Sequence, residues 1–346
     1  MPDWPMFHRD PSRTGFTPEK VEGPLSLRWI LQTEERVFFS SPTVFQGFCY
    51  CGSRDGYLYA VNALTGALKW RYHTGDEGNL SNSVEEGLIF SGSSRDGCLR
   101  AISTEKGELR WIFQTLGPVF ATPLVAEKLV FIGSSDCTLY ALQKTDGKLV
   151  WKEKCGGELR YASCLYGLTL FTGATDGCLY ANHLENGFRL WRFKTEGPIY
   201  GTPAADGNFV LVGSDDKHIY ALDVERGEKQ WHFRTENAVR STCALADGKV
   251  VLTSLDGRCY ALEQFSGRLL WSYRSNDSIY SSPLVAGETV IFGSNDGFLY
   301  GLDLSSGMLK WRNDLGSAII SSPALAGGIV YVGAENGCLY ALDVAS

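Results

Sequence analysis

Short apolar runs alternate with polar turn residues along the entire chain. The runs are rich in Val, Ile, Phe and Tyr, and Gly, Asp, Asn or Ser bound them on both sides. A strand with one buried face alternates with a period of two, and that is the period seen here. No segment longer than a turn shows helical periodicity. The pattern therefore predicts an all-β protein built from many short strands.

The strands belong to a repeat that is marked by tryptophan. One Trp occurs in each unit, at a spacing of 40 or 41 residues, and only Trp4 lies outside the series. The series comprises Trp29, Trp70, Trp111, Trp151, Trp191, Trp231, Trp271 and Trp311. A period of about 40 residues is typical of a propeller blade or a solenoid unit. The whole chain is therefore predicted to be one repeat architecture.

Each unit contains four strand-like pieces. In the seventh unit they are SIYSSP (278–283), VIFGS (290–294), DGFLYGL (296–302) and GMLKW (307–311). The Asp-Gly pair before the third piece is a strong two-residue hairpin signal, because a type I′ turn needs positive φ at both central positions. Four antiparallel strands per repeat form a propeller blade. The repeat predicts an eight-bladed β-propeller with four antiparallel strands in each blade.

The two ends of the chain are predicted to meet in one blade. The last unit stops after its third strand, at GCLYALDVAS (337–346), whereas LSLRWIL (25–31) resembles an isolated fourth strand. Pairing of these segments closes the ring and removes an exposed sheet edge. We expect residues 1–24 to form a leader that packs on the propeller, and residues 25–346 to form one domain.

The tail of each unit resembles a known motif. AVNALTGALKW (60–70), ALDVERGEKQW (221–231) and GLDLSSGMLKW (301–311) resemble the tryptophan-docking motif of the PQQ-like repeat propellers, the family of quinoprotein alcohol dehydrogenase-like and BamB-like proteins. The resemblance covers all eight units and implies that each Trp stacks between neighbouring blades. It does not extend to an adjacent Cys-Cys pair, to calcium ligands or to a catalytic Asp. We therefore expect no cofactor, neither PQQ nor Ca²⁺.

Charge and composition exclude several classes of function. The formal net charge is −7 and no Lys/Arg run occurs, which argues against a nucleic-acid surface. No apolar run approaches the ~20 residues of a membrane span. The first residues show no secretory signal pattern, so we expect a cytoplasmic protein, and a monomer. Its ten Cys are expected to be free thiols, and Cys is predicted to follow the turn in every second blade, at 98, 178, 259 and 338.

When the eight units are aligned, one position in the Asp-Gly turn forms a column of acidic residues that ends in an Asn. It comprises Asp55, Asp96, Asp136, Asp176, Asp216, Asp256, Asp296 and Asn336. Each side chain lies in its own hairpin turn, where Asp accepts hydrogen bonds from local backbone groups. We therefore interpret the column as structural and predict no metal site. The five His residues lie in different units without metal-ligand spacing.

Exceptions to the repeat identify a candidate site. The first strand of each blade is expected to line the central channel, where space is narrow. At one position of the aligned first strands, every unit has a small residue except the fourth, which has Tyr161. At the position before it the residues are apolar or aromatic, except for Arg160 and Arg240. Odd-numbered blades carry its aromatic residues, which are Phe39, Phe120, Tyr200 and Tyr280. These seven residues form a predicted ligand site at the channel mouth, where Arg can hold an anion between aromatic walls.

The sequence allows two roles for the arginines and three classes of function for the protein. Each Arg either binds a ligand or pairs with a nearby carboxylate such as Glu158 or Glu236. The leading hypothesis is a propeller that binds a protein, a peptide or a small molecule at its channel face, because the loops are short and uniform. The alternatives are a small-molecule enzyme at the channel mouth, without a recognisable triad or metal site, and a PQQ-dependent dehydrogenase.

Overall fold

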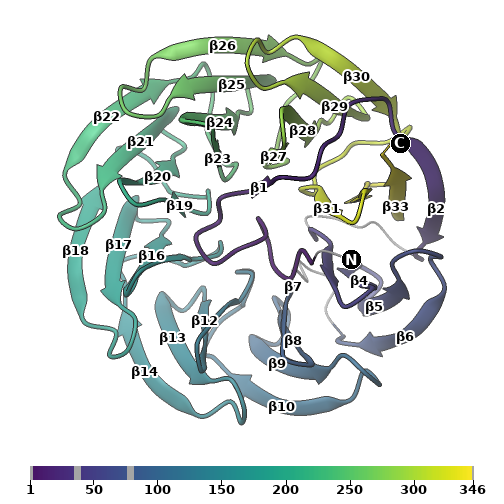
Figure 1. The fold of residues 1–346 in the computed structure, drawn as a ribbon. Helices are drawn as coiled ribbons and strands as arrows, with labels where there is room; N and C mark the ends of the chain where they lie inside the picture. The colour runs from purple at the N-terminus through teal and green to yellow at the C-terminus, as the bar shows by residue number, and fades with distance from the viewer. Residues whose placement is uncertain (1–2, 35–39, 76–81, 345–346) are drawn as a thin grey trace.

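The protein is a closed ring of eight β-sheets arranged around a central axis (Figure 1). The computed structural model describes residues 3–34, 40–75 and 82–344. The prediction of an eight-bladed propeller with four antiparallel strands per blade is confirmed. The described residues form no helix that is long and apolar enough to span a membrane.

Each blade runs outward from the axis in chain order, so its first strand is innermost and its fourth strand faces solvent. The first two blades comprise β3 (Thr43–Phe45), β4 (Phe48–Gly52), β5 (Tyr57–Asn62), β6 (Leu68–His73), β7 (Asn82–Glu85), β8 (Leu88–Gly92), β9 (Cys98–Ser103) and β10 (Leu109–Gln114). The third and fourth comprise β11 (Leu124–Ala126), β12 (Leu129–Gly133), β13 (Thr138–Gln143), β14 (Leu149–Lys154), β15 (Cys164–Tyr166), β16 (Thr169–Gly173), β17 (Cys178–His183) and β18 (Arg189–Lys194).

The second half of the ring repeats this order. The fifth and sixth blades comprise β19 (Ala204–Ala205), β20 (Phe209–Gly213), β21 (His218–Asp223), β22 (Lys229–Arg234), β23 (Ala244–Ala246), β24 (Lys249–Thr253), β25 (Arg258–Glu263) and β26 (Leu269–Arg274). The seventh and eighth comprise β27 (Leu284–Ala286), β28 (Thr289–Gly293), β29 (Phe298–Asp303), β30 (Leu309–Asp314), β31 (Ala324–Ala326), β32 (Ile329–Gly333), β33 (Cys338–Asp343) and β2 (Ser26–Gln32).

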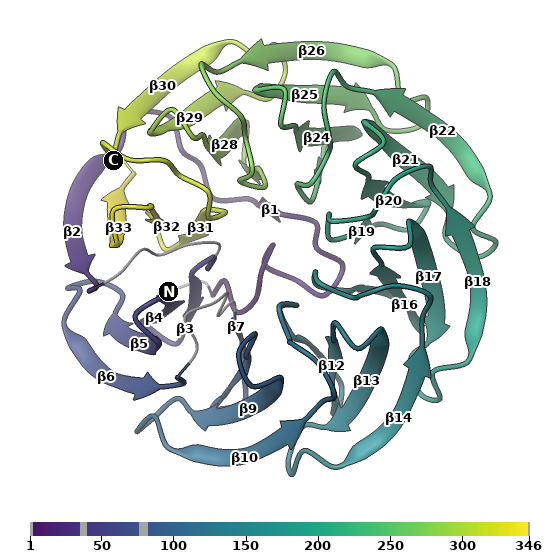
Figure 2. The ribbon, with the colours of Figure 1, turned by 180° about the vertical axis from the view of Figure 1, so that it is seen from behind.

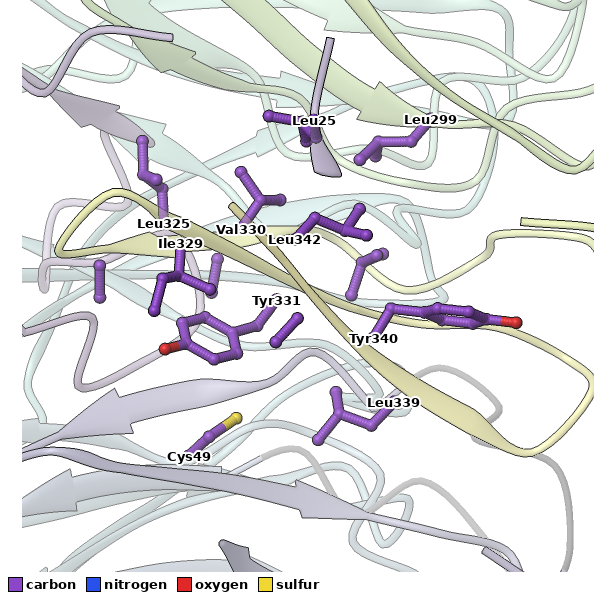
Figure 3. Close-up of a cluster of buried hydrophobic side chains, with 14 of the residues drawn as sticks. Leu25, Cys49, Leu299, Leu325, Ile329, Val330, Tyr331, Leu339, Tyr340 and Leu342 are labelled. Atoms are coloured by element: carbon purple, nitrogen blue, oxygen red, sulfur yellow. The ribbon is translucent and has the colours of Figure 1, made fainter. Parts of the chain in front are cut away.

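The eighth blade joins the two ends of the chain. Strand β2 pairs antiparallel with β33, as the sequence predicted. Behind this pair, side chains from both ends share one apolar cluster, including Leu25, Tyr331 and Leu342 (Figure 3). Burial of apolar area is the main driving force for such closure. The ring is therefore held by packing as well as by the strand pair.

The tryptophan column links each blade to the next. In seven units the indole Nε1 donates to a backbone carbonyl of the following blade, at 2.9 to 3.2 Å. The donor-acceptor pairs are Trp29–Ala63, Trp70–Thr104, Trp111–Lys144, Trp151–Leu184, Trp191–Val224, Trp231–Gln264 and Trp271–Leu304. The indole fills the wedge between two sheets and its one N–H is satisfied there. Within the described ranges, the Trp311 N–H has no partner.

The acidic column has the structural role that the sequence predicted. In the seventh blade Asp296 Oδ1 accepts the Phe298 N–H within the turn. Its other oxygen accepts the Tyr300 hydroxyl at 2.7 Å and the Asn276 N–H at 3.0 Å. Asp55, Asp216 and Asp256 make the same two kinds of bond, so these side chains both shape their turns and connect two blades. The described residues contain no group of three or more candidate metal ligands.

The second blade departs from this pattern, because Arg100 replaces the usual tyrosine and forms an ion pair with Asp96. Burial alone would raise the pKa of Asp96, but bonds from Arg100, the Ser93 hydroxyl and the Cys98 N–H outweigh it and hold the pKa well below 3.8. The folded state thus favours the ionised carboxylate, and this stabilisation is present above about pH 4 and is lost as the pH falls further.

We expect Asp96→Asn to lower Tm at pH 7. The difference from the wild type should shrink as the pH falls below about 4, because the carboxyl of the unfolded wild-type chain then takes up a proton whereas that of the folded protein does so only at lower pH. Thermal unfolding of both proteins at pH 7, 5, 4 and 3 measures this difference. A gap that stays constant or widens toward low pH contradicts the assigned pKa shift.

The ten cysteines are all free thiols, and nine of them are buried. The predicted alternation of Cys after the turn is wrong in the sixth blade. Arg258 occupies that position and pairs with Arg274 on the neighbouring strand, as Cys178 pairs with Lys194 in the fourth blade. Cys259 lies one residue later and points into the core, because side chains of a strand alternate between its two faces.

The leader crosses the middle of the ring in both views (Figures 1 and 2). It forms a bridge with the first blade at Trp4–Val44, and β1 (Phe16–Thr17) pairs parallel with β27. Between these points, leader carbonyls accept backbone N–H groups from further innermost strands. The donors are Val84, Leu165, Ala205, Leu245 and Val285. The leader therefore lies across the ends of the innermost strands, on the face opposite the Asp-Gly turns.

Candidate functional site: a blind well on the propeller axis

The central channel holds a well with an empty volume of about 580 Å³, part of which is open to solvent. Its lining comprises Phe7, Ser41, Phe120, Thr122, Arg160, Tyr161, Ala162, Thr202, Arg240, Thr242, Tyr280, Ser282, Ile320 and Ser322. Phe7 belongs to the leader, and the others come from the innermost segments of the blades. The leader thus forms the floor of the well, and the mouth lies at the face of the Asp-Gly turns.

The structure brings most of the predicted site residues together. Phe120, Arg160, Tyr161, Arg240 and Tyr280 all line the well. Tyr200 is absent from the lining but lies directly behind it, with its ring centroid 6.1 Å from that of Tyr161. Phe39 lies outside the described residues. The predicted residues form an arc that runs from the third blade to the seventh.

Arg160 is held at the mouth by two neighbours. Its Nε donates to Glu158 Oε2 at 2.6 Å, and its Cζ lies 5.2 Å from the ring centroid of Phe120. Glu158 is not among the residues that line the well. Neither Nη atom of Arg160 has a hydrogen-bond partner among the described residues. The two Nη groups are therefore available to a ligand.

Arg240 is fixed more firmly. Its Nε and Nη2 donate to the two oxygens of Asp215 at 2.9 and 2.7 Å, and its Cζ lies 4.9 Å from the ring centroid of Tyr200. The Asp215 carboxylate and the resulting hydrogen bonds raise the pKa of Arg240. Such a bidentate pair gives the guanidinium one orientation. Only the Nη1 edge remains without a protein partner in the described part of the chain.

The predicted carboxylate partners were therefore half right. Arg160 pairs with Glu158 as one reading proposed, whereas Glu236 as a partner of Arg240 is wrong. The Asp215 carboxylate reaches Arg240 from the turn of the preceding blade, 25 residues earlier in the chain. Arg160 and Arg240 can each pair with a carboxylate and still line the well, because a guanidinium has more than one edge that donates hydrogen bonds.

The column of small residues does not line the channel as the sequence suggested. Ser241, Ser281 and Ser321 are buried and bond to the end of the second strand in their own blade, as in Ser321 Oγ to Gly333 O at 2.8 Å. These residues are small because the first two strands of the blade approach each other closely there. Their size does not serve to keep the central channel open. Tyr161 is too large for that space, and its side chain lines the well instead.

Tyr161 is a neutral hydroxyl donor in this setting. Burial raises its pKa, although the nearby Arg240 guanidinium opposes this effect. Its oxygen has no hydrogen-bond partner among the residues that the structure describes. A phenol with a raised pKa holds its proton at neutral pH and can donate it in a hydrogen bond. Tyr161 therefore adds a donor to those of the two arginines.

Two parts of the lining were missed by the sequence reasoning. The first is a ring of hydroxyls one residue before the conserved position of Pro in each repeat, which comprises Ser41, Thr122, Thr202, Thr242, Ser282 and Ser322. Three of these oxygens accept a backbone N–H of the preceding blade, at 2.9 to 3.1 Å. The repeated Ser/Thr-Pro pairs were the available signal. The second is Phe7, which no repeat could reveal.

The lining as a whole is rich in hydrogen-bond donors. Among the residues that the structure describes, it contains two guanidinium groups, two tyrosines and a ring of hydroxyls, and none of these described lining residues is a carboxylate, a histidine or a cysteine. Such a surface can hold and orient a ligand that carries acceptor atoms. None of its described side chains is suited to remove a proton at neutral pH.

Comparisons with known proteins were made for sequence families, for curated proteins and for solved structures. A family model described as "Beta-alanine-activating enzyme, beta-propeller" matches residues 126–346, and one described as "Outer membrane protein assembly factor BamB" matches residues 54–165. No curated protein matches the chain. The first match spans more than half of the chain.

Solved structures share the fold at low sequence identity. BamB from Moraxella catarrhalis is 17% identical over 92% of this chain and 99% of its own, with a TM-score of 0.79. Quinohemoprotein alcohol dehydrogenase from Comamonas testosteroni is 15% identical over 99% and 80%, with a TM-score of 0.87. The computationally designed Ika8 protein is 19% identical over 90% and 98%, with a TM-score of 0.81. The chain is thus a PQQ-like repeat propeller, and it belongs to the family described as the beta-propeller of the beta-alanine-activating enzyme.

Proposed function

We propose that this propeller is a binding module whose central well holds a ligand or part of a partner, and that it carries out no quinone redox chemistry. The observation that carries the proposal is the coincidence of two features. The well is closed at one end by the leader, and the repeat breaks at its mouth, at Arg160, Tyr161 and Arg240. A blind site with convergent donors suits recognition.

The shape of the rest of the molecule supports binding over catalysis. Loops between strands are short throughout the described chain, so no large insertion covers the mouth. The family name refers to an enzyme that activates beta-alanine. We propose that a propeller of this family contributes recognition to such a system, because the described residues of the lining offer hydrogen-bond donors and no general base.

A small-molecule enzyme at the same mouth is the second candidate. The observation in its favour is Tyr161, whose hydroxyl has no hydrogen-bond partner among the described residues and lies close enough to Arg240 for the guanidinium charge to oppose the rise in its pKa. A tyrosine of this kind can act as a general acid. Product formation from a bound ligand, abolished by Tyr161→Phe with binding retained, distinguishes an enzyme from a binding module.

A metabolite-wide thermal-shift screen tests the proposed function. A ligand present at 100 times its Kd adds about 2.7 kcal/mol to the free energy of unfolding and raises Tm accordingly. We expect the shift to be lost in Arg160→Ala and in Arg240→Ala, since each variant removes donors from the mouth. Arg192→Gln, which changes an exposed arginine on β18, is the matched control and should keep the shift.

Two outcomes contradict the proposal. A ligand whose shift survives in both variants binds somewhere other than the well. A PQQ-dependent change in absorbance together with dye reduction, after reconstitution with PQQ and Ca²⁺, overturns the absence of quinone chemistry and favours a dehydrogenase.

A further inference from the structure

An arginine of the leader is fully buried beneath the floor of the well. Arg13 has no exposed surface, and its Nε donates to Ser163 O at 3.1 Å. Its Nη1 donates to the backbone oxygen of Phe7, the residue that forms the floor. Its Cζ lies 5.9 Å from the centroid of the Phe7 ring. A positive charge is therefore placed directly against the floor.

This charge is not neutralised by a bonded carboxylate. The Asp10 carboxylate is close enough for its charge to raise the pKa of Arg13, but it accepts the N–H and the hydroxyl of Thr14, and no hydrogen bond joins it to Arg13 in the described chain. The Nη2 of Arg13 has no partner there at all. Burial lowers the pKa of Arg13 to about 10, so the guanidinium still carries its charge at neutral pH. Burying a charge in this way is unfavourable without compensation.

The electrostatic potential of Arg13 is positive, as is that of the two arginines at the mouth of the well. Arg160 and Arg240 line the well, whereas their bonded partners Glu158 and Asp215 are not among its lining residues. Two guanidinium groups thus line the well and a third lies behind Phe7, and no acidic side chain occurs among the described residues of the lining. Fields in a cleft with walls of low dielectric constant are stronger than in water.

We infer that the well takes a small molecule in which a single carboxylate is attached to an apolar, planar body, and that Arg13 contributes to this charge preference from below the floor. This inference rests on the proposed function, since it names the ligand class of the same well. The carboxylate bonds to the Nη groups of Arg160 and Arg240 and to Tyr161. The planar body packs against the rings of Phe7 and Phe120.

The charge preference is tested with four probes of one shape on the full chain. Benzoate, benzamide, benzamidine and phenyl phosphate share a benzene ring and differ in the attached group, which is respectively an anion, neutral, a cation and a larger anion. Titration calorimetry measures the Kd of each at low salt. We expect benzoate to bind about tenfold or more tightly than benzamide, and benzamidine to bind most weakly.

The variants test which arginines set the preference. Arg13→Met should reduce the ratio of benzamide to benzoate Kd by roughly three- to tenfold, because it removes one charge without touching the ligand. Arg13→Lys, which keeps the charge, should retain most of the ratio and serves if Arg13→Met does not fold. Arg192→Gln is the control for loss of one surface charge. The role of Arg13 is overturned if Arg13→Met keeps the wild-type ratio of the benzamide Kd to the benzoate Kd. It is also overturned if Arg13→Lys loses this ratio while the leader is still docked.

The outcomes separate this inference from the proposed function. Equal or tighter binding of benzamide or benzamidine overturns the anion preference, and tighter binding of phenyl phosphate overturns the choice of a carboxylate. If none of the four probes binds while the metabolite screen finds a ligand lost in Arg240→Ala, the ligand class is wrong and the binding module stands. If the screen also finds no such ligand, both proposals fail.

Discussion

Gly267→Ala lowers the free energy of unfolding by about 2–5 kcal/mol, whereas Gly248→Ala lowers it by about 1–2 kcal/mol. Both glycines have a positive φ, +68° and +67°, so both variants carry the same backbone strain. They differ in their surroundings. A Cβ at Gly267 would lie 2.5 Å from Cε3 of Trp231, whereas no atom lies within 4 Å of a Cβ at Gly248.

The difference between the two variants therefore isolates the docking of one indole. The turn that contains Gly267 also supplies Gln264 O, which accepts the Trp231 N–H at 2.9 Å. An added methyl group pushes the turn away from the ring and stretches this bond between the fifth and sixth blades. Urea unfolding followed by circular dichroism measures both variants. Equal losses in the two would show that the contact between tryptophan and glycine does not hold the blades together.

Trp4→Ala lowers the free energy of unfolding by about 3–5 kcal/mol, the usual result of removing a buried aromatic side chain. Trp4 is 2% exposed and packs in the cluster that joins the first and eighth blades. It also holds the leader on the first blade through its bridge to Val44. The loss of Trp4 should therefore loosen the leader as well as weaken the core. Leu116→Ala, which truncates an 88% exposed side chain, is the control and should change stability by less than about 0.5 kcal/mol.

Loosening of the leader has a separate readout in Cys164. This thiol is fully buried next to Arg13, and burial raises its pKa far above the ordinary value, so the docked protein holds it as an unreactive thiol. In Trp4→Ala we expect iodoacetamide to label Cys164 faster, as measured by peptide mass spectrometry. Cys259, buried in the sixth blade, should keep its wild-type rate. Unchanged labelling of Cys164 would mean that the leader stays docked without Trp4.

The repeat explains why the fold could be predicted in detail. One unit specifies four strands by its alternation and two of its turns by Gly, and eight copies leave one arrangement, a closed ring of eight blades. The pairing of β2 with β33 followed from the strand missing at one end and the spare strand at the other. Because the same strand and turn signals recur in eight units, an ambiguous signal in one unit can be assigned from the other seven.

The site was predictable only where it broke the repeat. Arg160, Tyr161 and Arg240 stood out because seven sister units defined what was expected at each position. The hydroxyl ring was overlooked because it obeys the repeat, and Phe7 because the leader has no sister. The error about the small column arose because alternation along a strand says which residues share a face but not which face meets the axis.

Repeat number, strand order, ring closure and the exceptional residues are all local or periodic properties, and the amino-acid order was sufficient for them. The partner of Arg240, the blind end of the channel and the charge beneath its floor depend on contacts between segments far apart in the chain. Asp215 reaches Arg240 across a blade boundary, and Arg13 meets Ser163 across 150 positions. No periodicity relates such segments, because their distance is set by how the leader and the blades pack around the axis. Only the folded ring turns a row of repeated strands into a closed well with positive charge on its lining.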